Sequence, residues 1–375
     1  MKVLVVGGTG PTGPLVVQGL LDRGHEVTMY HRGYHEVAEL PEVHRHLHGD
    51  PYDRDALRSD VGMEDWDLVL GMYGRLRYLA DIMVGRTRKL VGIGGTPSIM
   101  QPQHLPFPRG LEFPLPEEHP TYTDRELSSY GFAVADTERR VLAHHERGEY
   151  AVVLFRYTGL YGPRVPRNWM WPIVRRVLDG RPHIVIPGDG SQLRPMASVP
   201  NAAHQVLLAC DRDEGNGQVF YSVDATTYTL RDTIAIITEA LGHRWDVVEV
   251  SHPLAYDLAT GYVSQRGQQL ATEKLRTLLG YHDVVEPAQA LAEAARWLVE
   301  HRGLLDEEQM DDIVGNPYAY DLEDQLIAAF RRWQDEITRT LPAPKLGART
   351  SEFRGSYRPR NTGEGAGAEA PVTES

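Results

Sequence analysis

The chain has 375 residues, a net charge of −13, and a composition that is 41% hydrophobic and 24% charged, as in an ordinary globular protein with a large core. The acidic balance, without any basic block, argues against a nucleic-acid surface, and the single cysteine, Cys210, excludes a disulfide framework. No apolar run approaches the roughly 20 residues of a membrane helix, which argues against a membrane protein.

The first 33 residues predict a strand, a glycine turn, a helix and a second strand. The apolar run 3–6 is typical of a strand buried on both faces, and it leads into the turn 7–13, with glycines at 7, 10 and 13. Such glycines allow a tight bend, close approach of a pyrophosphate, and close packing of the next helix, here about 14–23. A strand that starts at residue 3 leaves no room for a signal peptide, so we expect a cytoplasmic protein. We expect this turn to bind NAD or NADP, through Gly7, Thr9, Gly10, Pro11, Thr12 and Gly13. The alternative is a turn with a purely structural role.

The second strand, 27–30, ends at His31-Arg32-Gly33, about 20 residues beyond the turn, where a Rossmann unit selects the cofactor ribose. Arg32 stands where an NAD enzyme usually has an acid, and its guanidinium can fork onto a 2′-phosphate, which favours NADP. Histidines 44, 46 and 48 then alternate along a short strand. Because no carboxylate or cysteine sits at ligand spacing, we interpret them as a polar strand face and expect no metal.

Two aspartates follow the histidine strand. Asp50 can accept a hydrogen bond from the adenine amino group, and Asp53 caps a helix that begins near residue 54. The fourth strand, 66–71, ends at Gly71, which we also expect at the cofactor, and the fifth covers 89–95. A helix between these strands is expected to carry Arg75, Arg77 and Arg86.

The proline-rich residues 101–124 predict a long loop over a sheet edge, and long ordered loops are usually functional. Ser128-Ser129-Tyr130 then opens a helix, Gly131 to about Glu146, and a strand follows at 150–156. The expected later helices are one containing Asn168, Trp169, Trp171 and Arg175, and those at 201–209, 230–241, 273–279, 288–301 and 322–338; the later strands are 183–186, 218–223 and 247–250.

This order predicts an α/β protein with a doubly wound parallel sheet, the Rossmann fold, and a small α/β C-terminal substrate subdomain. We place the dinucleotide-binding part at 1–160 and the substrate-binding subdomain, interleaved with the last sheet strands, at 161–340. The apolar pattern stops after Leu341, so residues 341–375 are expected to form a disordered tail.

Four motifs together resemble the extended short-chain dehydrogenase/reductase family, the group with NAD-dependent epimerases and dehydratases. They are the glycine turn, the Tyr130-Gly131 helix start with Glu138 eight residues on, the Arg156…Tyr161-Gly162-Pro163 segment, and Gly188-Asp189-Gly190-Ser191-Gln192…Arg194. The resemblance covers residues 3 to about 300. The 30–33 end and the stretch 316–324 are similar to an atypical branch, which includes chloroplast stem-loop-binding relatives.

Family members use a tyrosine, a lysine four residues later, and a hydroxyl residue after the fifth strand. Here Tyr130 is present, Val134 takes the lysine position, and the hydroxyl position falls on Gly94 or Gly95, with Thr96 displaced by one residue. The chain has only four lysines, and Lys89 is expected at the wrong end of the sheet, so Arg75 or Arg77 would have to supply a substitute charge. The resemblance thus implies Tyr130 and Thr96 as catalytic, Tyr157 as cofactor-binding, and Asn168, Trp169 and Arg194 as substrate-binding residues, with Arg194 facing an anionic group.

Structural roles are the alternatives for two of these residues: Tyr130 could be an aromatic residue that only begins a helix, and Trp169 could only pack in the protein core. We expect an NAD(P)-dependent oxidoreductase, a carbonyl reductase of a small metabolite or nucleotide-sugar-like substrate. The alternatives are a nucleotide-binding or RNA-associated protein without standard catalysis and a sugar-nucleotide epimerase or dehydratase. A phenol without a neighbouring cation stays protonated at neutral pH, which favours reduction over oxidation. Whether the chain forms a homodimer stays open.

Overall fold

The computed structural model describes residues 1–34, 37–72, 76–101, 104–105, 113–166, 168–258, 269–304, 306–308 and 318–341. Contacts group residues Met1–Ile327 into one unit and Ala328–Ser375 into a second. Within the described ranges, no helix combines the length and the apolar character that crossing a membrane requires.

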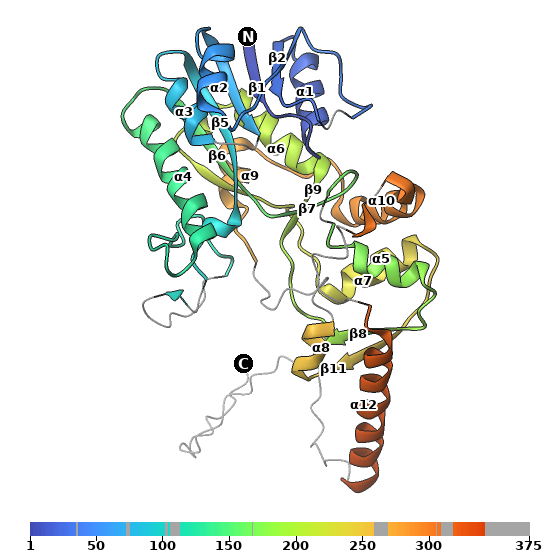
Figure 1. Cartoon of the computed structure of the whole chain (residues 1–375). Helices are drawn as coiled ribbons and strands as arrows, with labels where there is room; N and C mark the ends of the chain where they lie inside the picture. Colours follow the sequence, from blue (N-terminus) through green and yellow to red (C-terminus); the bar gives the residue numbers. More distant parts are fainter. Residues whose placement is uncertain are drawn as a thin grey trace, which may run out of the picture. The chain divides into compact units, whose positions relative to one another are not determined.

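A seven-stranded parallel sheet forms the centre of the first unit (Figure 1). The strand order is β10-β6-β5-β4-β1-β2-β3, so the chain winds outward first in one direction and then in the other. The crevice between β1 and β4, where the order reverses, is the place at which a doubly wound sheet binds its ligand. The strands are β1 (Lys2–Val6), β2 (Glu26–His31), β3 (Arg45–His48), β4 (Trp66–Met72), β5 (Thr87–Gly95), β6 (Ala151–Tyr157) and β10 (Val219–Ser222).

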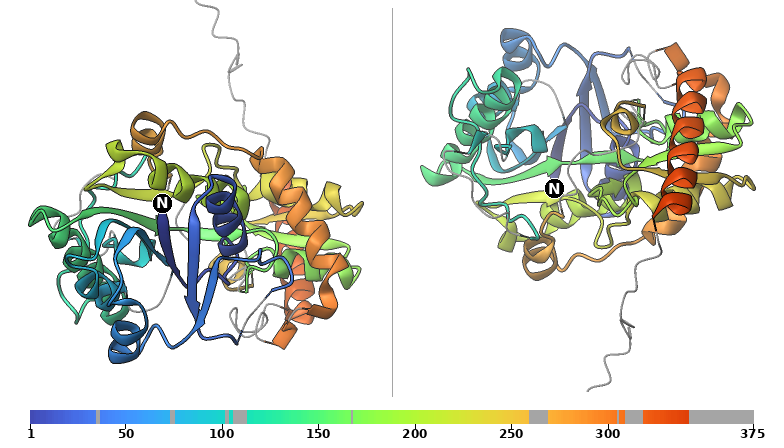
Figure 2. Two further views of the ribbon diagram at one scale, coloured as in Figure 1. Left: turned by 90° about the horizontal axis from the view of Figure 1, so that it is seen from above. Right: turned by 90° about the horizontal axis from the view of Figure 1, so that it is seen from below.

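Helices cover both faces of this sheet, as the view from above shows (Figure 2). Alternate residues of a buried strand face opposite layers. In β1, Val3 and Val5 belong to one core cluster and Leu4 and Val6 to the other. The first cluster includes residues of α1 (Gly13–Asp22), α6 (Val199–Asp211) and α9 (Glu273–Leu279), and the second those of α2 (Arg54–Val61), α3 (Leu76–Ile82) and α4 (Ser129–Glu146).

A separate hydrophobic core supports the later part of the chain. It is built around Trp171, Ile173 and Val174, all fully buried. This is the small α/β subdomain expected from the sequence, and the predicted fold class is confirmed. Its elements are β7 (Gly159–Tyr161), α5 (Trp171–Leu178), β8 (His183–Pro187), β9 (Met196–Ser198), α7 (Leu230–Ala240), β11 (Asp246–Val250), α8 (Pro253–Leu258) and α10 (Pro287–Glu300).

The remaining described elements are short or terminal: η1 (Thr96–Ser98), η3 (Asp213–Gly215), η4 (Arg302–Leu304) and α12 (Tyr320–Thr340). Several predictions lie outside the described residues, namely Arg75, the loop positions 102–103 and 106–112, subdomain residues 259–268 and 309–317, and the tail from 342 onward.

Two local expectations are corrected. Arg86 lies in the turn before β5, because α3 ends at Ile82 and Gly85 turns the chain with a φ of 69°. Asn168 and Trp169 precede α5, which begins at Trp171 with Pro172 in its first turn, the position that best tolerates proline. The predicted cap at Asp53 is confirmed, since its carboxylate accepts the N–H groups of Asp55 and Ala56.

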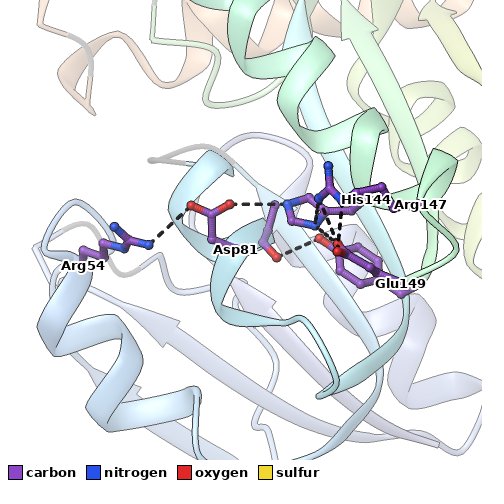
Figure 3. Close-up of polar contacts among 7 residues, drawn as sticks. Arg54, Asp81, His144, Arg147 and Glu149 are labelled. Carbon is purple, nitrogen blue, oxygen red and sulfur yellow. Dashed lines mark hydrogen bonds and ion pairs between the residues drawn. The ribbon is translucent and has the colours of Figure 1, made fainter.

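A chain of polar contacts joins the three helices of the second layer (Figure 3). Arg54, the first residue of α2, lies 3.5 Å from a carboxylate oxygen of Asp81 in α3. The other oxygen of Asp81 lies 3.4 Å from Nε2 of His144 in α4. These contacts fix the positions of α2, α3 and α4 relative to one another.

The same chain continues to the start of β6. Hydrogen bonds from Arg147 and His144 lower the pKa of Glu149 to about 2. The ring of His144 stacks on that of Tyr150, with centroids 5.2 Å apart, and the Tyr150 hydroxyl donates to the Ala80 carbonyl at 2.8 Å. These contacts hold the C-terminal end of α4. Tyr130 lies at the opposite end of this helix, which begins at Ser129.

Candidate active site

The turn after β1 has the backbone geometry of a phosphate-binding loop. Gly7 and Gly8 adopt φ values of 100° and 89°, which favour glycine. A Cβ on Gly7 would lie 2.2 Å from the Met72 carbonyl oxygen, and one on Gly13 would lie 2.0 Å from the Gly8 carbonyl oxygen. Gly13 therefore allows α1 to begin close to the strand, where its N–H groups can face an anion.

A cavity of about 570 Å³ opens beside this turn. Its wall includes four of the predicted cofactor residues of the turn, Gly7, Thr9, Gly10 and Pro11, together with Arg32. The Arg32 guanidinium lies between two aromatic rings, 5.8 Å from the centroid of Tyr34 and 5.7 Å from that of Tyr52. Glycine turn, cavity and arginine together fit a dinucleotide.

Other predicted cofactor residues lie behind or outside this wall. Thr12 is buried, and its hydroxyl accepts a hydrogen bond from Tyr157 at 3.3 Å. Gly71 lies within β4, where a Cβ would meet Leu76, and the cavity is reached instead by the next residue, Met72. Asp50 is exposed, and its carboxylate accepts the Tyr52 N–H. The cavity is lined instead by the next two residues, Pro51 and Tyr52, which the sequence analysis missed.

A second cavity, of about 470 Å³, brings together Thr96, Tyr130 and Arg194. The start of α4 explains how Tyr130 reaches Thr96. The Ser128 hydroxyl caps the helix by accepting the Gly131 N–H at 3.0 Å. A Cβ on Gly131 would lie 2.8 Å from the Pro97 carbonyl oxygen, so the helix start packs directly on η1. The Tyr130 side chain is 69% exposed and accessible to a substrate.

The missing lysine leaves a third cavity, of about 490 Å³, with both Tyr130 and Val134 in its wall. Lys89 cannot compensate, because its Nζ donates to the Arg212 carbonyl at 2.7 Å. Arg77 lies over the Tyr78 ring, 5.4 Å from the centroid, and lines neither cavity around Tyr130. Among the described residues that line these two cavities, Arg194 is the one cation.

Arg194 lies over the indole of Trp169, 4.7 Å from the ring centroid. Burial lowers the pKa of Arg194 to about 10, which leaves it charged at neutral pH. No carboxylate in the described ranges forms an ion pair with it. The buried Nε1 of Trp169 and Nδ2 of Asn168 also lack a partner among the described residues, while Asn168 Oδ1 accepts the Met170 N–H. These three side chains offer donors and no acceptor, which suits an anionic ligand.

Thr158 connects the three cavities, since it lines all of them. It follows β6 directly, and its hydroxyl donates to the Ser222 carbonyl at 2.7 Å. The sequence analysis missed Thr158. The rule that ligands bind outside the carboxyl ends of parallel strands could have indicated it, because the strand ends at Tyr157.

Residues 106–223 match the sequence model of the NAD dependent epimerase/dehydratase family. This match covers about a third of the chain, and the curated relatives and solved structures described below are similar to the chain over a larger part of its length. The predicted resemblance to extended short-chain dehydrogenase/reductases is thereby confirmed, and the expected cofactor class, NAD or NADP, agrees with the family's description.

Two curated proteins similar to this chain are a dehydrogenase and a reductase. The chain is 25% identical over 339 residues to a 3 beta-hydroxysteroid dehydrogenase/Delta 5-->4-isomerase of Mycobacterium tuberculosis, covering 80% of this chain and 90% of that protein. It is 27% identical to a 3-diazoavenalumate denitrifying reductase of a Streptomyces species, covering 57% of this chain and 73% of that protein.

Solved structures share the fold. The UDP-glucose 4-epimerase of Thermotoga maritima has a TM-score of 0.64 at 18% identity, covering 80% of this chain and 100% of the other. A dTDP-glucose 4,6-dehydratase from Streptomyces venezuelae, crystallised with NAD, has a TM-score of 0.61 at 21% identity, covering 82% and 99%. At these identities the likeness concerns the fold alone.

Proposed function

We propose that this protein is an NAD(P)-dependent oxidoreductase that reduces a carbonyl group on a small anionic metabolite. The observation that carries the proposal is that Tyr130, Thr96 and Arg194 line one cavity, and that Arg194 has no ion pair with any carboxylate of the described residues. Thr158 joins this cavity to the one beside the glycine turn, so that a substrate can lie next to a bound nicotinamide. Bound NADPH would supply the hydride.

Tyr130 acts as the proton donor in this proposal. When a carbonyl accepts a hydride, negative charge develops on its oxygen, and a phenol O–H can donate a proton there. Thr96 offers a second donor in the same cavity. Val134 stands at the expected lysine position, and no lysine is among the described residues that line the two cavities around Tyr130, so we assign Tyr130 to donating a proton rather than to removing one from an alcohol. Reduction is therefore favoured over oxidation at neutral pH.

Arg194 holds the anionic end of the substrate. Its guanidinium can form paired hydrogen bonds with a carboxylate or phosphate, and stacking on Trp169 fixes its plane. We assign Asn168 and Trp169 to the same end, because each has a buried N–H group without a partner in the described ranges. Residues 161–340, interleaved with the last sheet strands, supply this substrate-binding part.

The test is carbonyl reduction by wild type, Tyr130→Phe and Val134→Lys, followed as NADPH consumption. Tyr130→Phe should slow reduction by roughly 10²-fold, the scale of one general acid, while NADPH affinity stays unchanged. Val134→Lys should raise alcohol oxidation relative to reduction, since the added cation favours the phenolate. An unchanged reduction rate in Tyr130→Phe, or faster oxidation than reduction in wild type at pH 7, would contradict the proposal.

A sugar-nucleotide epimerase or dehydratase is the second candidate, favoured by the guanidinium of Arg194, which suits a diphosphate. Such an enzyme returns its hydride to the substrate and consumes no cofactor overall. With NAD⁺ or NADP⁺ as the added cofactor, conversion of a nucleotide sugar without net formation of NADH or NADPH would favour this candidate over the reductase.

A further inference from the structure

Three histidines on the edge of the sheet face the same side. Strands β2 and β3 are parallel, and their register places His48 opposite His31 and His46 opposite Met29. Because side chains two residues apart share a face, His31, His46 and His48 project together. Their ring centroids are 4.6 Å apart for His31 and His46, 5.2 Å for His31 and His48, and 4.8 Å for His46 and His48.

Each of these rings has one nitrogen close to the nitrogens of the other two. The three nitrogens lie within 4.8 Å of one another, and Nε2 of His31 contacts Nε2 of His46. A tetrahedral ion with metal–nitrogen bonds of about 2.0–2.1 Å holds its ligand atoms about 3.3 Å apart. His31 is only 4% exposed, whereas His46 and His48 are exposed on the strand that ends the sheet. The two exposed rings have room to rotate toward the separation that a tetrahedral ion requires.

We propose that His31, His46 and His48 bind a divalent transition metal ion. Imidazole nitrogens suit zinc, nickel, copper and cobalt, whereas magnesium and calcium prefer oxygen ligands. Three protein ligands leave one position of a tetrahedral ion for water, which the exposure of His46 and His48 allows. This proposal departs from the interpretation of the histidines at 44, 46 and 48 as a polar strand face, an interpretation that stays a prediction. The sequence pattern argued against a metal because no carboxylate or cysteine lies at ligand spacing, and it could not show that His31 pairs with His48 across the two strands.

The metal site adjoins the cofactor cavity, which His31 also lines. Nδ1 of His31 accepts the Gly33 N–H at 3.0 Å, and Arg32 lies between these two residues. Coordination through Nε2 requires the ring proton to lie on Nδ1, so the bond to Gly33 is given up when the ion binds. The ion therefore competes with a contact that positions the turn bearing Arg32. This inference does not depend on the proposed reduction.

Metal binding is tested on the full chain with Co²⁺ and Zn²⁺ alone, without cofactor. Co²⁺ should give the visible absorption of a four-coordinate ion at one ion per chain, and Zn²⁺ should displace it. His46→Gln and His48→Gln should each weaken binding at least tenfold, and the double variant should abolish it. His44→Gln is the matched control, because His44 lies two residues before His46 and its Nδ1 instead accepts the Val27 N–H. This control should bind as wild type does.

Equal affinity in wild type and the double variant, or the absence of saturable binding, would overturn the proposal, since the chain has 16 histidines that could bind metal weakly. Far-UV circular dichroism and NADPH binding check that the variants fold. The site can also be tested on the wild-type protein alone, by NMR. In long-range ¹H–¹⁵N spectra, Zn²⁺ should shift the ring nitrogens of His31, His46 and His48, and shifts confined to other histidines would refute the site.

Discussion

At the scale of single residues, we predict that Arg32 sets which cofactor the cavity prefers. It occupies the end of the second strand and lies between the rings of Tyr34 and Tyr52 at the cavity wall. Tyrosine rings on either side limit the orientations of the guanidinium, and a positive charge at this place suits the 2′-phosphate that distinguishes NADP from NAD. The structure thus supports the sequence-based preference for NADP, which stays a prediction.

Replacing Arg32 should therefore change the affinity for one cofactor only. Arg32→Ala should weaken NADPH binding about tenfold or more, the value of a charged hydrogen bond, and leave NADH binding unchanged. Dissociation constants from nicotinamide fluorescence measure this. Arg45→Ala is the control, because Arg45 is exposed and pairs with Glu64 outside the cavity wall. Equal affinities for the two cofactors, unaltered in Arg32→Ala, would contradict the assignment.

At the scale of elements, the glycine turn and α1 act as one unit. Gly10 lines the cavity and is half-buried, whereas Gly13 is buried against the Gly8 carbonyl. We therefore expect Gly10 to serve cofactor binding and Gly13 to serve the packing of α1 on the sheet. A side chain at 10 would occupy the space of the pyrophosphate, but one at 13 would push the helix away from the strand.

Two variants distinguish cofactor binding at Gly10 from helix packing at Gly13. Gly10→Val should abolish NADPH binding while the free energy of unfolding stays within about 1 kcal/mol of wild type. Gly13→Ala should lower the free energy of unfolding by about 1–3 kcal/mol, the cost of overpacking, and weaken NADPH binding as well. Denaturant titration and NADPH fluorescence are the two measurements. Undiminished NADPH affinity in Gly10→Val would place the cofactor elsewhere.

The polar contacts among α2, α3 and α4 predict a pH dependence of stability. Hydrogen bonds from Arg147 and His144 depress the pKa of Glu149 to about 2, below its ordinary value of 4.5. A depressed pKa means that the carboxylate stabilises the fold above pH 4.5 and that this contribution is lost as the pH falls from 4.5 toward 2.

Wild type should accordingly unfold at a higher temperature than Glu149→Gln at pH 7, and the difference should shrink as the pH is lowered through this window. Melting temperatures of both proteins at pH 7, 5, 4 and 3 measure it, and taking their difference removes the effect of other carboxylates. A difference that stays constant over this range, or grows toward low pH, would show that Glu149 does not stabilise the helical layer as an anion.

At the scale of the whole molecule, the strand order gathers the site from distant segments. The strand order reverses between β1 and β4, which opens a crevice at the carboxyl ends of these strands. Thr158, the residue after β6, lines both the cavity beside the glycine turn and the cavity that contains Tyr130. Arg194 reaches the same place from the segment before β9. The reductase proposal therefore depends on packing between segments that lie more than 100 residues apart in the sequence.

The sequence by itself determined what depends on neighbouring residues. Apolar runs marked the buried strands, glycine spacing marked the turn, and hydroxyl or carboxylate side chains marked the helix starts at Asp53 and Ser128, because caps and tight turns are satisfied within a few residues. The absence of a lysine at position 134 was equally plain, since the family spacing is local to one helix.

Tertiary structure alone decided which side chains meet. The register of β2 against β3 brings His31 to His46 and His48, and the fold of the subdomain places Trp169 under Arg194. It also placed Tyr52 and Met72 in the cavity wall where the sequence suggested Asp50 and Gly71: Met72 is one step beyond Gly71 in β4, and Asp50 instead accepts the Tyr52 N–H in the turn after β3. Contacts of this kind depend on strand pairing and packing over long sequence distances, which local patterns do not specify.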